Sequence, residues 1–370
     1  MKQQTQINKA EWGEIELGEI LDYEQPTKYI VESTDYKDEY ETPVLTAGKS
    51  FILGYTNETK GICDKLPVII FDDFTTDNKF VDFRFKVKSS AMKILRPKNE
   101  LINIKFVFLA MQGLKFDAKR HKRYYLSAYQ NLKIPMPFLD GKPDIQTQKR
   151  IVSILEKAEA LKQNREHADK LTKEYLQAVF YEMFGDKSEL KNLKDVCGII
   201  MGQSPPGNSY NENGEGTPFF QGKAEFTEKY PIVKKWTTQP TKIALPNSIL
   251  ISVRAPVGSV NLCNIKCCIG RGLASLIPKK EVKLEYVYSW LKLNEKNISD
   301  MGTGSTFKAI SSTQLANLQI PVSSLDLQQK FASIVEKVEK LKEKQQKSKD
   351  KIDEMFDSLM QKAFKGELMK

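Results

Sequence analysis

The sequence predicts an α+β fold that is built twice: a small mixed domain and a long α-helix, then the same pair again. Three observations predict it. Two helical segments that start 180 residues apart align without a gap. Landmark dipeptides recur in the same order, at offsets between 175 and 186 residues. Between them, short β-branched and aromatic runs alternate with Gly, Pro, Asn and Asp, which is typical of strands and turns.

The helical segments carry the clearest repeat. QKRIVSILEKAEALK (148–162) matches QQKFASIVEKVEKLK (328–342) at eight of fifteen positions, and each follows a strand that ends in Ile-Pro, LKIP at Pro135 and LQIP at Pro321. We therefore expect a first domain at 1–141, a first long helix within 142–186, a second domain at 187–322 and a second long helix within 323–370.

The two globular domains match more faintly. Runs such as LPVIIFDD, KFVDFRFKV and SILISVRAPVGSV predict strands, and KFVFLAMQGL and EYVYSWLKLN predict one short helix per copy. The shared landmarks, first copy before second, are Thr42-Pro43 and Thr217-Pro218, Leu66-Pro67 and Leu245-Pro246, ILRP ending at Pro97 and SLIP ending at Pro278.

Each long helix has one apolar stripe, and the first is expected to run from about Ile145 to Phe184. A lone helix of this kind is marginal in water, so we expect the two to pair antiparallel as a coiled coil with pseudo-two-fold symmetry. Arg165 and Gln345 interrupt the stripes at the same register and would meet at the crossing point, unless this part faces solvent or another protein. The stripe positions are Ile151, Ile154, Ala158, Leu161, Ala168, Tyr175 and Val179, then Phe331, Ile334, Val338, Leu341, Ser348, Met355 and Leu359.

Composition favours a polyanionic partner and argues against a membrane segment. Lys and Arg number 57 against 47 Asp and Glu, a net charge of +10, which favours nucleic acid or an anionic membrane face, with a merely solvated basic surface as the alternative. No apolar run approaches the roughly 20 residues of a spanning helix. The five cysteines show no paired spacing, and Cys263, Cys267 and Cys268 fit two short strands better than a zinc site. We therefore expect a cytoplasmic protein with reduced thiols.

Catalytic motifs are incomplete, so we expect a non-catalytic chain. TAGKS (46–50) resembles a phosphate loop but has Pro43 where that motif needs glycine. In FDDFTTDNK (71–79), Asp73, Asp77 and Lys79 form a crude nuclease-like cluster that has no counterpart in the second copy and fits a hairpin turn better. A metal-dependent nuclease and a structural coiled-coil adaptor remain the alternatives.

The whole chain resembles the specificity subunit of type I restriction–modification systems. The second copy carries GQSP (202–205), TPFFQGKAEF, PNSILISVRAPVG and MGTGSTFKAISSTQLANLQIP, and the first carries YEQPTKYIV, TPVLTAGKSFILGYT and KRHKRYYLSAYQNLKIPMP. The resemblance implies two target-recognition domains, each reading half of an asymmetric, interrupted sequence in double-stranded DNA, on a spacer of paired helices.

The same resemblance implies partners for a prokaryotic, cytoplasmic protein. Modification subunits would dock on the helices and methylate adenine with S-adenosylmethionine, and restriction subunits would add ATP-driven translocation and cleavage. No cofactor or metal is expected on this chain, because S-adenosylmethionine, ATP and Mg²⁺ would belong to the partners. A type II-like restriction system that uses the same architecture is the remaining alternative.

Candidate DNA contacts in the second domain lie on loops that Gly and Pro frame. Arg is the usual bidentate reader of guanine and Gln of adenine, whereas Thr and Lys suit phosphates. We therefore select Gln203, Ser204, Tyr210, Arg254, Arg271, Thr306 and Lys308.

In the first domain the densest basic and aromatic cluster is KRHKRYY (119–125). Adjacent tyrosines of an extended segment alternate faces, so one of Tyr124 and Tyr125 is expected in the core. His121 fits a strand hydrogen bond as well as a contact. The candidates are Lys49, Lys93, Lys119, Arg120, His121, Lys122, Arg123, Tyr124 and Tyr125, of which Lys49 and Lys93 are secondary.

Overall fold

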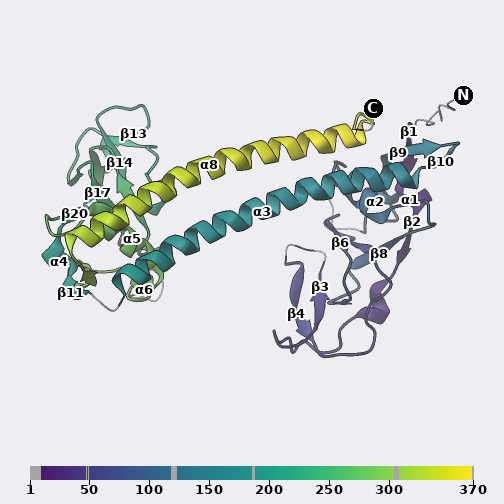
Figure 1. The fold of residues 1–370 in the computed structure, drawn as a ribbon, viewed down its shortest axis with the longest axis horizontal. Helices are drawn as coiled ribbons and strands as arrows, with labels where there is room; N and C mark the ends of the chain where they lie inside the picture. The colour runs from purple at the N-terminus through teal and green to yellow at the C-terminus, as the bar shows by residue number, and fades with distance from the viewer. Residues whose placement is uncertain are drawn as a thin grey trace, which may run out of the picture. The chain divides into compact units, whose positions relative to one another are not determined.

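The computed structural model describes residues 10–46, 48, 50–117, 123–185, 188–303 and 308–368. By their internal contacts the residues divide into two compact units (Figure 1). The first unit combines Met1–Asn164 with Lys349–Lys370, and the second is Arg165–Ser348. Each unit therefore contains one globular domain and part of each long helix.

The first unit is organised around the antiparallel sheet β2-β8-β5-β6. A second sheet, β4-β3-β7, contains a parallel pair, and β1-β9-β10 leads into the long helix. The strands are β1 (Glu11–Glu16), β2 (Leu21–Glu24), β3 (Thr42–Leu45), β4 (Ile52–Thr56), β5 (Val68–Asp72), β6 (Asn78–Val81), β7 (Lys86–Val87), β8 (Met92–Pro97), β9 (Lys133–Leu139) and β10 (Lys142–Pro143). The helices before the long one are α1 (Leu17–Ile20) and α2 (Ile104–Met111).

The second unit repeats this order with the sheets β12-β20-β17-β18, β13-β15-β14-β19-β16 and β11-β21. Its strands are β11 (Glu189–Asn192), β12 (Cys197–Met201), β13 (Tyr210–Asn211), β14 (Thr217–Phe220), β15 (Trp236–Thr237), β16 (Ile243–Ala244), β17 (Ser248–Ser252), β18 (Val260–Cys263), β19 (Cys267–Ile269), β20 (Leu273–Pro278) and β21 (Gln319–Val322). Its short helices are α4 (Leu193–Val196), α5 (Leu284–Leu293), α6 (Glu295–Asp300) and α7 (Ser312–Ala316).

The predicted repeat is confirmed element by element. The strands over VIIFD and SILIS, which follow Leu66-Pro67 and Leu245-Pro246, are the sheet-centre strands β5 and β17. The predicted short helices are α2 and α5. In both units the strand that contains the Thr-Pro landmark pairs in parallel with the strand that precedes β8 or β20. These pairs are β3 with β7 and β14 with β19.

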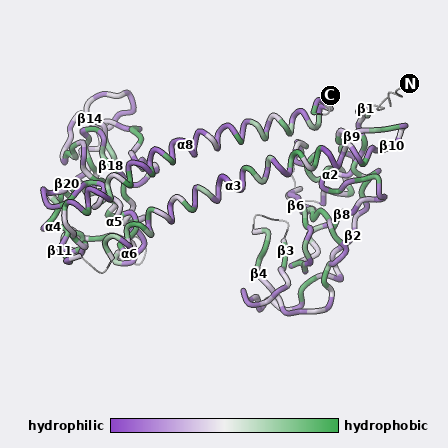
Figure 2. The backbone as a smooth tube through the Cα atoms, viewed as in Figure 1, coloured by the Kyte–Doolittle hydropathy of each residue, from purple (hydrophilic) through white to green (hydrophobic). Residues whose placement is uncertain are grey.

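The long helices are α3 (Ile145–Phe184) and α8 (Leu325–Phe364), and α3 has the predicted bounds. Figure 2 shows both as mostly hydrophilic helices with short hydrophobic stretches. In the first unit Ile151 and Leu155 share a core cluster with Ala363, and Lys162 pairs with Asp353 at 2.8 Å. Residue numbers therefore rise along α3 while they fall along α8.

The second unit shows the same antiparallel order. The ring of Phe180 on α3 lies 5.3 Å from that of Phe331 on α8, edge to face, and Thr172 bonds to Gln345 further along. Phe180 and Phe184 pack on Tyr286 of α5, so the helix end and the domain share one core. The predicted antiparallel pairing is thus confirmed within each unit.

The predicted apolar stripe is wrong in the middle of both helices. Leu161 and Leu341, at the same repeat position, are 48% and 47% exposed, and Tyr175 and Met355, also equivalent, are exposed as well. Thr172 and Gln345 fall on the same three-and-four spacing and are buried, so the contact face keeps the predicted register there but is polar. The spacing gives the register of a helix face, but it does not decide which positions of that face are covered.

Arg165 and Gln345 do not form the direct pair that the crossing-point hypothesis implied. Arg165 bonds within its own helix to Asp169 at 3.1 Å, whereas Gln345 donates to Thr172 at 2.9 Å. The contact between α3 and α8 in this part of the second unit is therefore polar, and the partner of Gln345 is Thr172 rather than Arg165.

Candidate nucleic-acid interface

Two loops of the second domain are joined at the end of β12 and the start of β20. The Gln203 N–H donates to the Ile269 carbonyl at 3.0 Å, and the Ser204 hydroxyl accepts from the Arg271 N–H at 3.3 Å. A Cβ on Gly202 would lie 2.1 Å from the carbonyl oxygen of Gly270, so only glycine fits there. The close approach holds Gln203 beside Arg271.

Two further segments extend this arrangement. The Val253 N–H donates to the Gly272 carbonyl at 2.9 Å, and the Ile310 N–H donates to the Val253 carbonyl at 3.0 Å. Arg254 also forms an isolated bridge with Ala309. Segments 202–204, 270–272, 253–254 and 308–310 therefore lie side by side, and we call them the second-domain loop row.

The loop row presents four exposed polar or basic side chains: Gln203, Arg254, Arg271 and Lys308. Each comes from one of four adjoining segments that backbone hydrogen bonds hold together, so the four exposed residues belong to one region of the domain. Guanidinium and amide groups suit the edges of bases, and an ammonium group suits a phosphate. The structure thus brings together four of the residues that the sequence selected from separate motifs.

Tyr210 occupies a supporting position in this region. Its ring stacks on Phe219 with the centroids 4.9 Å apart, and its hydroxyl donates to the Pro205 carbonyl at 2.9 Å. The side chain is half-buried, and its hydroxyl is already bonded to the loop that carries Ser204. Tyr210 therefore fixes the loop and has little surface of its own to offer.

The first domain has an equivalent arrangement of its backbone. The Asp73 N–H donates to the Ala91 carbonyl at 3.1 Å, and the Tyr124 N–H donates to the Asp73 carbonyl at 2.8 Å. These bonds match those of Val253 and Ile310, so Arg123 and Tyr124 occupy the positions of Ala309 and Ile310. Arg123 is exposed there.

Several predicted contacts fall outside the described residues. They are Lys49, Lys119, Arg120, His121, Lys122 and Thr306.

Three predicted contacts in the first domain require correction. Lys93 is 1% exposed and pairs with the equally buried Asp73 at 3.3 Å, and Tyr124 and Tyr125 are buried too. Desolvation by burial raises the pKa of the Tyr125 hydroxyl far above its ordinary value. A buried side chain has no surface on which DNA can lie, so these three residues support the fold. Sequence proximity to basic residues does not reveal burial.

The nuclease-like cluster has a structural explanation. Asp73 also accepts from the Tyr125 N–H at 3.0 Å, and Asp72 caps the turn by accepting from the Phe74 N–H at 2.8 Å. Strands β5 and β6 pair around this turn, which confirms the predicted hairpin. Among the described residues, no group of three or more His, Cys, Asp and Glu side chains is arranged to hold a metal.

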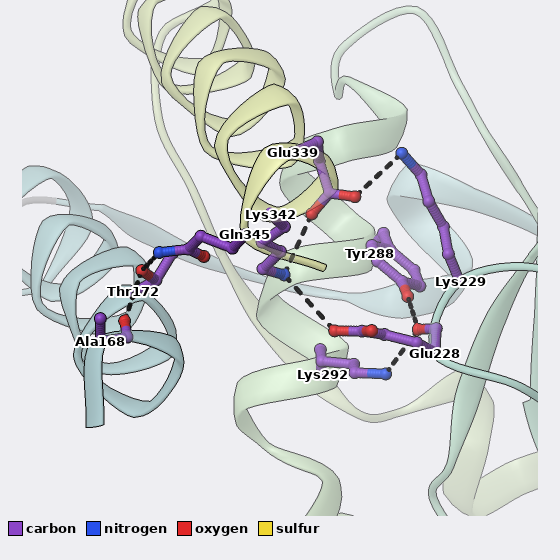
Figure 3. Close-up of polar contacts among 9 residues, drawn as sticks. All are labelled: Ala168, Thr172, Glu228, Lys229, Tyr288, Lys292, Glu339, Lys342 and Gln345. Carbon is purple, nitrogen blue, oxygen red and sulfur yellow. Dashed lines mark hydrogen bonds and ion pairs between the residues drawn. The ribbon is translucent and has the colours of Figure 1, made fainter. Parts of the chain in front are cut away.

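An ionic cluster fastens the second domain to α8 (Figure 3). Lys229 and Lys342 each lie 3.1 Å from the Glu339 carboxylate, and Lys342 is also 3.8 Å from Glu228. The carbonyl of Glu228 accepts from the Tyr288 hydroxyl at 3.3 Å. The segment around Glu228 is thereby joined to both α5 and α8.

Lys292 completes this cluster from α5. Its ammonium group donates to the Glu228 carbonyl at 3.2 Å, and burial lowers its pKa. No local pattern in the sequence points to this cluster, because Glu and Lys in a charged helix give no local signal of their partners.

Similarity to known proteins agrees with this arrangement. The family model of the type I restriction modification DNA specificity domain matches residues 9–172 and 185–354. The specificity subunit of the Escherichia coli type I restriction enzyme EcoR124I/EcoR124II is 35% identical over 356 residues, which cover 90% of this chain and 87% of that protein.

Solved structures show the same fold. A chain from a type I restriction–modification system, studied for its complex assembly and conformational transition, is 27% identical with a TM-score of 0.64, over 96% of this chain and 98% of that one. The specificity subunit from M. genitalium, 16% identical, has a TM-score of 0.60 over 98% of both chains. None of the helices in the described ranges has the length and apolar character to cross a membrane.

The repeated units, the loop row on the second domain and the match of both halves to one family model agree with one another. The chain belongs to the family of type I restriction–modification DNA specificity subunits.

Proposed function

We propose that this chain reads a bipartite, interrupted sequence in double-stranded DNA, with one globular domain on each half, and has no catalytic activity alone. The observation that carries the proposal is the second-domain loop row, where Gln203, Arg254, Arg271 and Lys308 are exposed on adjoining segments. Three amide or guanidinium groups next to an ammonium group match the combination of base contact and phosphate contact in specific DNA binding.

Divergence between the two domains supports an asymmetric target. The backbone bonds of the loop row recur in the first domain, yet the exposed Arg123 stands there in place of Ala309, and Phe74 in place of the exposed Arg254. The same framework therefore presents different side chains in each unit. Two readers of this kind would recognise half-sites that are not palindromic, as covalently joined dimers with unequal halves do.

The long helices would dock the modification subunits. Leu161 and Leu341 are exposed at equivalent repeat positions, and so are Tyr175 and Met355. In the first unit, Leu161 on α3 and Met355 on α8 flank the ion pair between Lys162 and Asp353. These two apolar side chains therefore lie at about the same height along the helix pair. The second unit offers Leu341 and Tyr175. A duplicated apolar surface suits two copies of one partner.

The chemistry would then belong to the partners in the cytoplasm. Modification subunits would bind S-adenosylmethionine and methylate adenine, and restriction subunits would use ATP and Mg²⁺ for translocation and cleavage. The geometry around Asp73 favours this division, because its carboxylate is already bonded to Lys93 and to the Tyr125 N–H.

The direct test is binding of the full chain to a pool of duplexes with a randomised centre, followed by sequencing of the bound fraction. We expect two short conserved blocks that are unlike each other and separated by a fixed gap. Recovery of one block, or of none, would contradict the two-domain reading. Incubation of the chain with Mg²⁺ and plasmid should leave the plasmid intact, and cutting that Asp77→Asn abolishes would establish a nuclease instead.

A further inference from the structure

Gln148 and Gln328 occupy the same repeat position near the start of α3 and α8, and both are 0% exposed. A fully buried glutamine is unusual, because its amide must find partners for both ends in the interior. Gln148 and Gln328 are also the first of the eight identities between the helical segments. The burial of the same polar residue in both units indicates a shared structural requirement.

The two amides make matching hydrogen bonds. Gln148 Oε1 accepts from the Asn103 N–H at 2.8 Å, and its Nε2 donates to the Leu101 carbonyl at 2.9 Å. In the second unit Gln328 Oε1 accepts from the Lys283 N–H, also at 2.8 Å.

Gln328 Nε2 donates to the Glu281 carbonyl at 3.2 Å, and additionally to the Ser323 carbonyl at 2.9 Å. Each glutamine thus holds a donor and an acceptor of one short backbone segment.

That backbone segment enters the helix of the globular domain. Asn103 and Lys283 are the N-cap residues of α2 and α5, and both helices pack into the core of their unit. The glutamines therefore link the start of each long helix to the start of a domain helix. A two-point bond fixes direction as well as distance, whereas apolar contacts at the same junction allow sliding.

We propose that Gln148 and Gln328 are positioning residues that set the angle of each target-recognition domain on its helix, and thereby the gap length that the protein accepts between its half-sites. The inference rests on the proposed function. Neither glutamine belongs to the loop row, so its loss leaves the base-reading side chains unchanged. A domain that tilts on its helix carries those side chains to a different position along the DNA.

The test compares binding to duplexes that contain both selected half-sites with gaps from three base pairs shorter to three longer than the preferred gap. We expect wild type to bind its preferred gap most tightly. In Gln148→Leu and in Gln328→Leu the affinity ratio between the preferred gap and its nearest neighbours should fall about tenfold, while preference for the bases of each half-site is kept. Matched controls are Gln146→Leu and Gln329→Leu, which replace exposed glutamines near the same positions.

An unchanged gap ratio in folded Gln148→Leu and Gln328→Leu overturns the inference, as does an equal fall in the controls. A simple loss of folded protein lowers binding to every gap alike and leaves the ratio intact. If the leucine variants do not fold, Gln148→Glu and Gln328→Glu, which keep the acceptor oxygen, carry the same comparison. If wild type itself selects no pair of half-sites, the proposed function fails rather than this inference.

Discussion

Gln345 on α8 donates through Nε2 to the hydroxyl of Thr172 on α3 at 2.9 Å, and both side chains are buried in the second unit. Thr172 in turn donates to the Ala168 carbonyl at 2.8 Å (Figure 3). The bond crosses between the two helices. A buried polar contact of this type specifies register at some cost in stability.

Removal of this hydroxyl should destabilise the helix pair. Thr172→Val leaves the Gln345 amide buried without its acceptor, and we expect a loss of about 1–3 kcal/mol in the free energy of unfolding. Thr172→Ser keeps the hydroxyl and should lose much less. The double variant Thr172→Val with Gln345→Leu should recover part of the loss in thermal unfolding. If the double variant were less stable than Thr172→Val alone, the loss would not come from the unpaired Gln345 amide, and the hydrogen bond would have no specific effect on stability.

The buried ion pair of the first domain gives a second prediction. Lys93→Met leaves the Asp73 carboxylate without its cation in the interior, and such a loss costs about 3–5 kcal/mol. Lys79→Met, at an exposed lysine on β6, should change stability by no more than about 0.5 kcal/mol. Chemical denaturation measures both. If folded Lys93→Met instead reduced the salt dependence of DNA binding, Lys93 would be a phosphate contact after all.

The loop row predicts separate roles for two basic residues. Arg271→Ala should relax preference at one base of one half-site, at a cost of about 1–3 kcal/mol for the preferred duplex. Lys308→Ala should weaken binding to all sequences and lower the slope of log affinity against log salt by about 1. Lys280→Ala, beyond the opposite end of β20, is the control. Binding titrations at several salt concentrations measure both effects. The assignment would be refuted if Lys308→Ala changed the base preference and Arg271→Ala changed only the salt dependence.

The exposed leucines predict the number of docked partners. Leu161→Lys or Leu341→Lys alone should reduce the modification subunits bound per chain from two to one, and the double variant should bind none. A lysine on each apolar surface would place a charge in the partner interface.

Leu171→Lys is the matched control, because Leu171 is equally exposed but its repeat counterpart is Lys351. Light scattering of the co-purified complexes gives the stoichiometry. Two partners retained on the double variant would place docking elsewhere.

The Glu339 cluster predicts a pH dependence of stability. Burial raises the pKa of Glu339, but the ion pairs with Lys342 and Lys229 outweigh it and hold the pKa below its ordinary 4.5. The contribution is therefore complete above about pH 4.5 and disappears as the pH falls through the lowered pKa. Glu339→Gln should lower stability at pH 7 by no more than about 1 kcal/mol, and the difference from wild type should vanish at low pH.

Thermal unfolding between pH 7 and pH 3 measures this difference. Glu343→Gln, an exposed change on the same helix, is the control. A stability difference between wild type and Glu339→Gln that was as large at pH 3 as at pH 7 would contradict the assignment.

The architecture was largely predictable, because repeats and periodicity are local properties of the sequence. The bounds of α3, the short helices α2 and α5 and the hairpin after β5 all follow from runs of neighbouring residues. The exposure of Gln203 and Arg271 was predictable, because Gly and Pro frame their loops. Burial was not predictable, since Lys93 and Arg123 look alike as basic residues near other basic residues.

Lys162 and its repeat counterpart Lys342 show why the ion pairs could not be predicted from the sequence. Lys162 and Lys342 are identical repeat positions, yet Lys162 pairs with Asp353 and Lys342 with Glu228 and Glu339. The repeat counterpart of Asp353 is Lys173, which cannot offer Lys342 a carboxylate. Local patterns in the sequence are enough to predict two domains on two similar helices. Which side chains face inward and which charges meet is visible only in the folded chain, because those contacts depend on residues that are distant in the sequence.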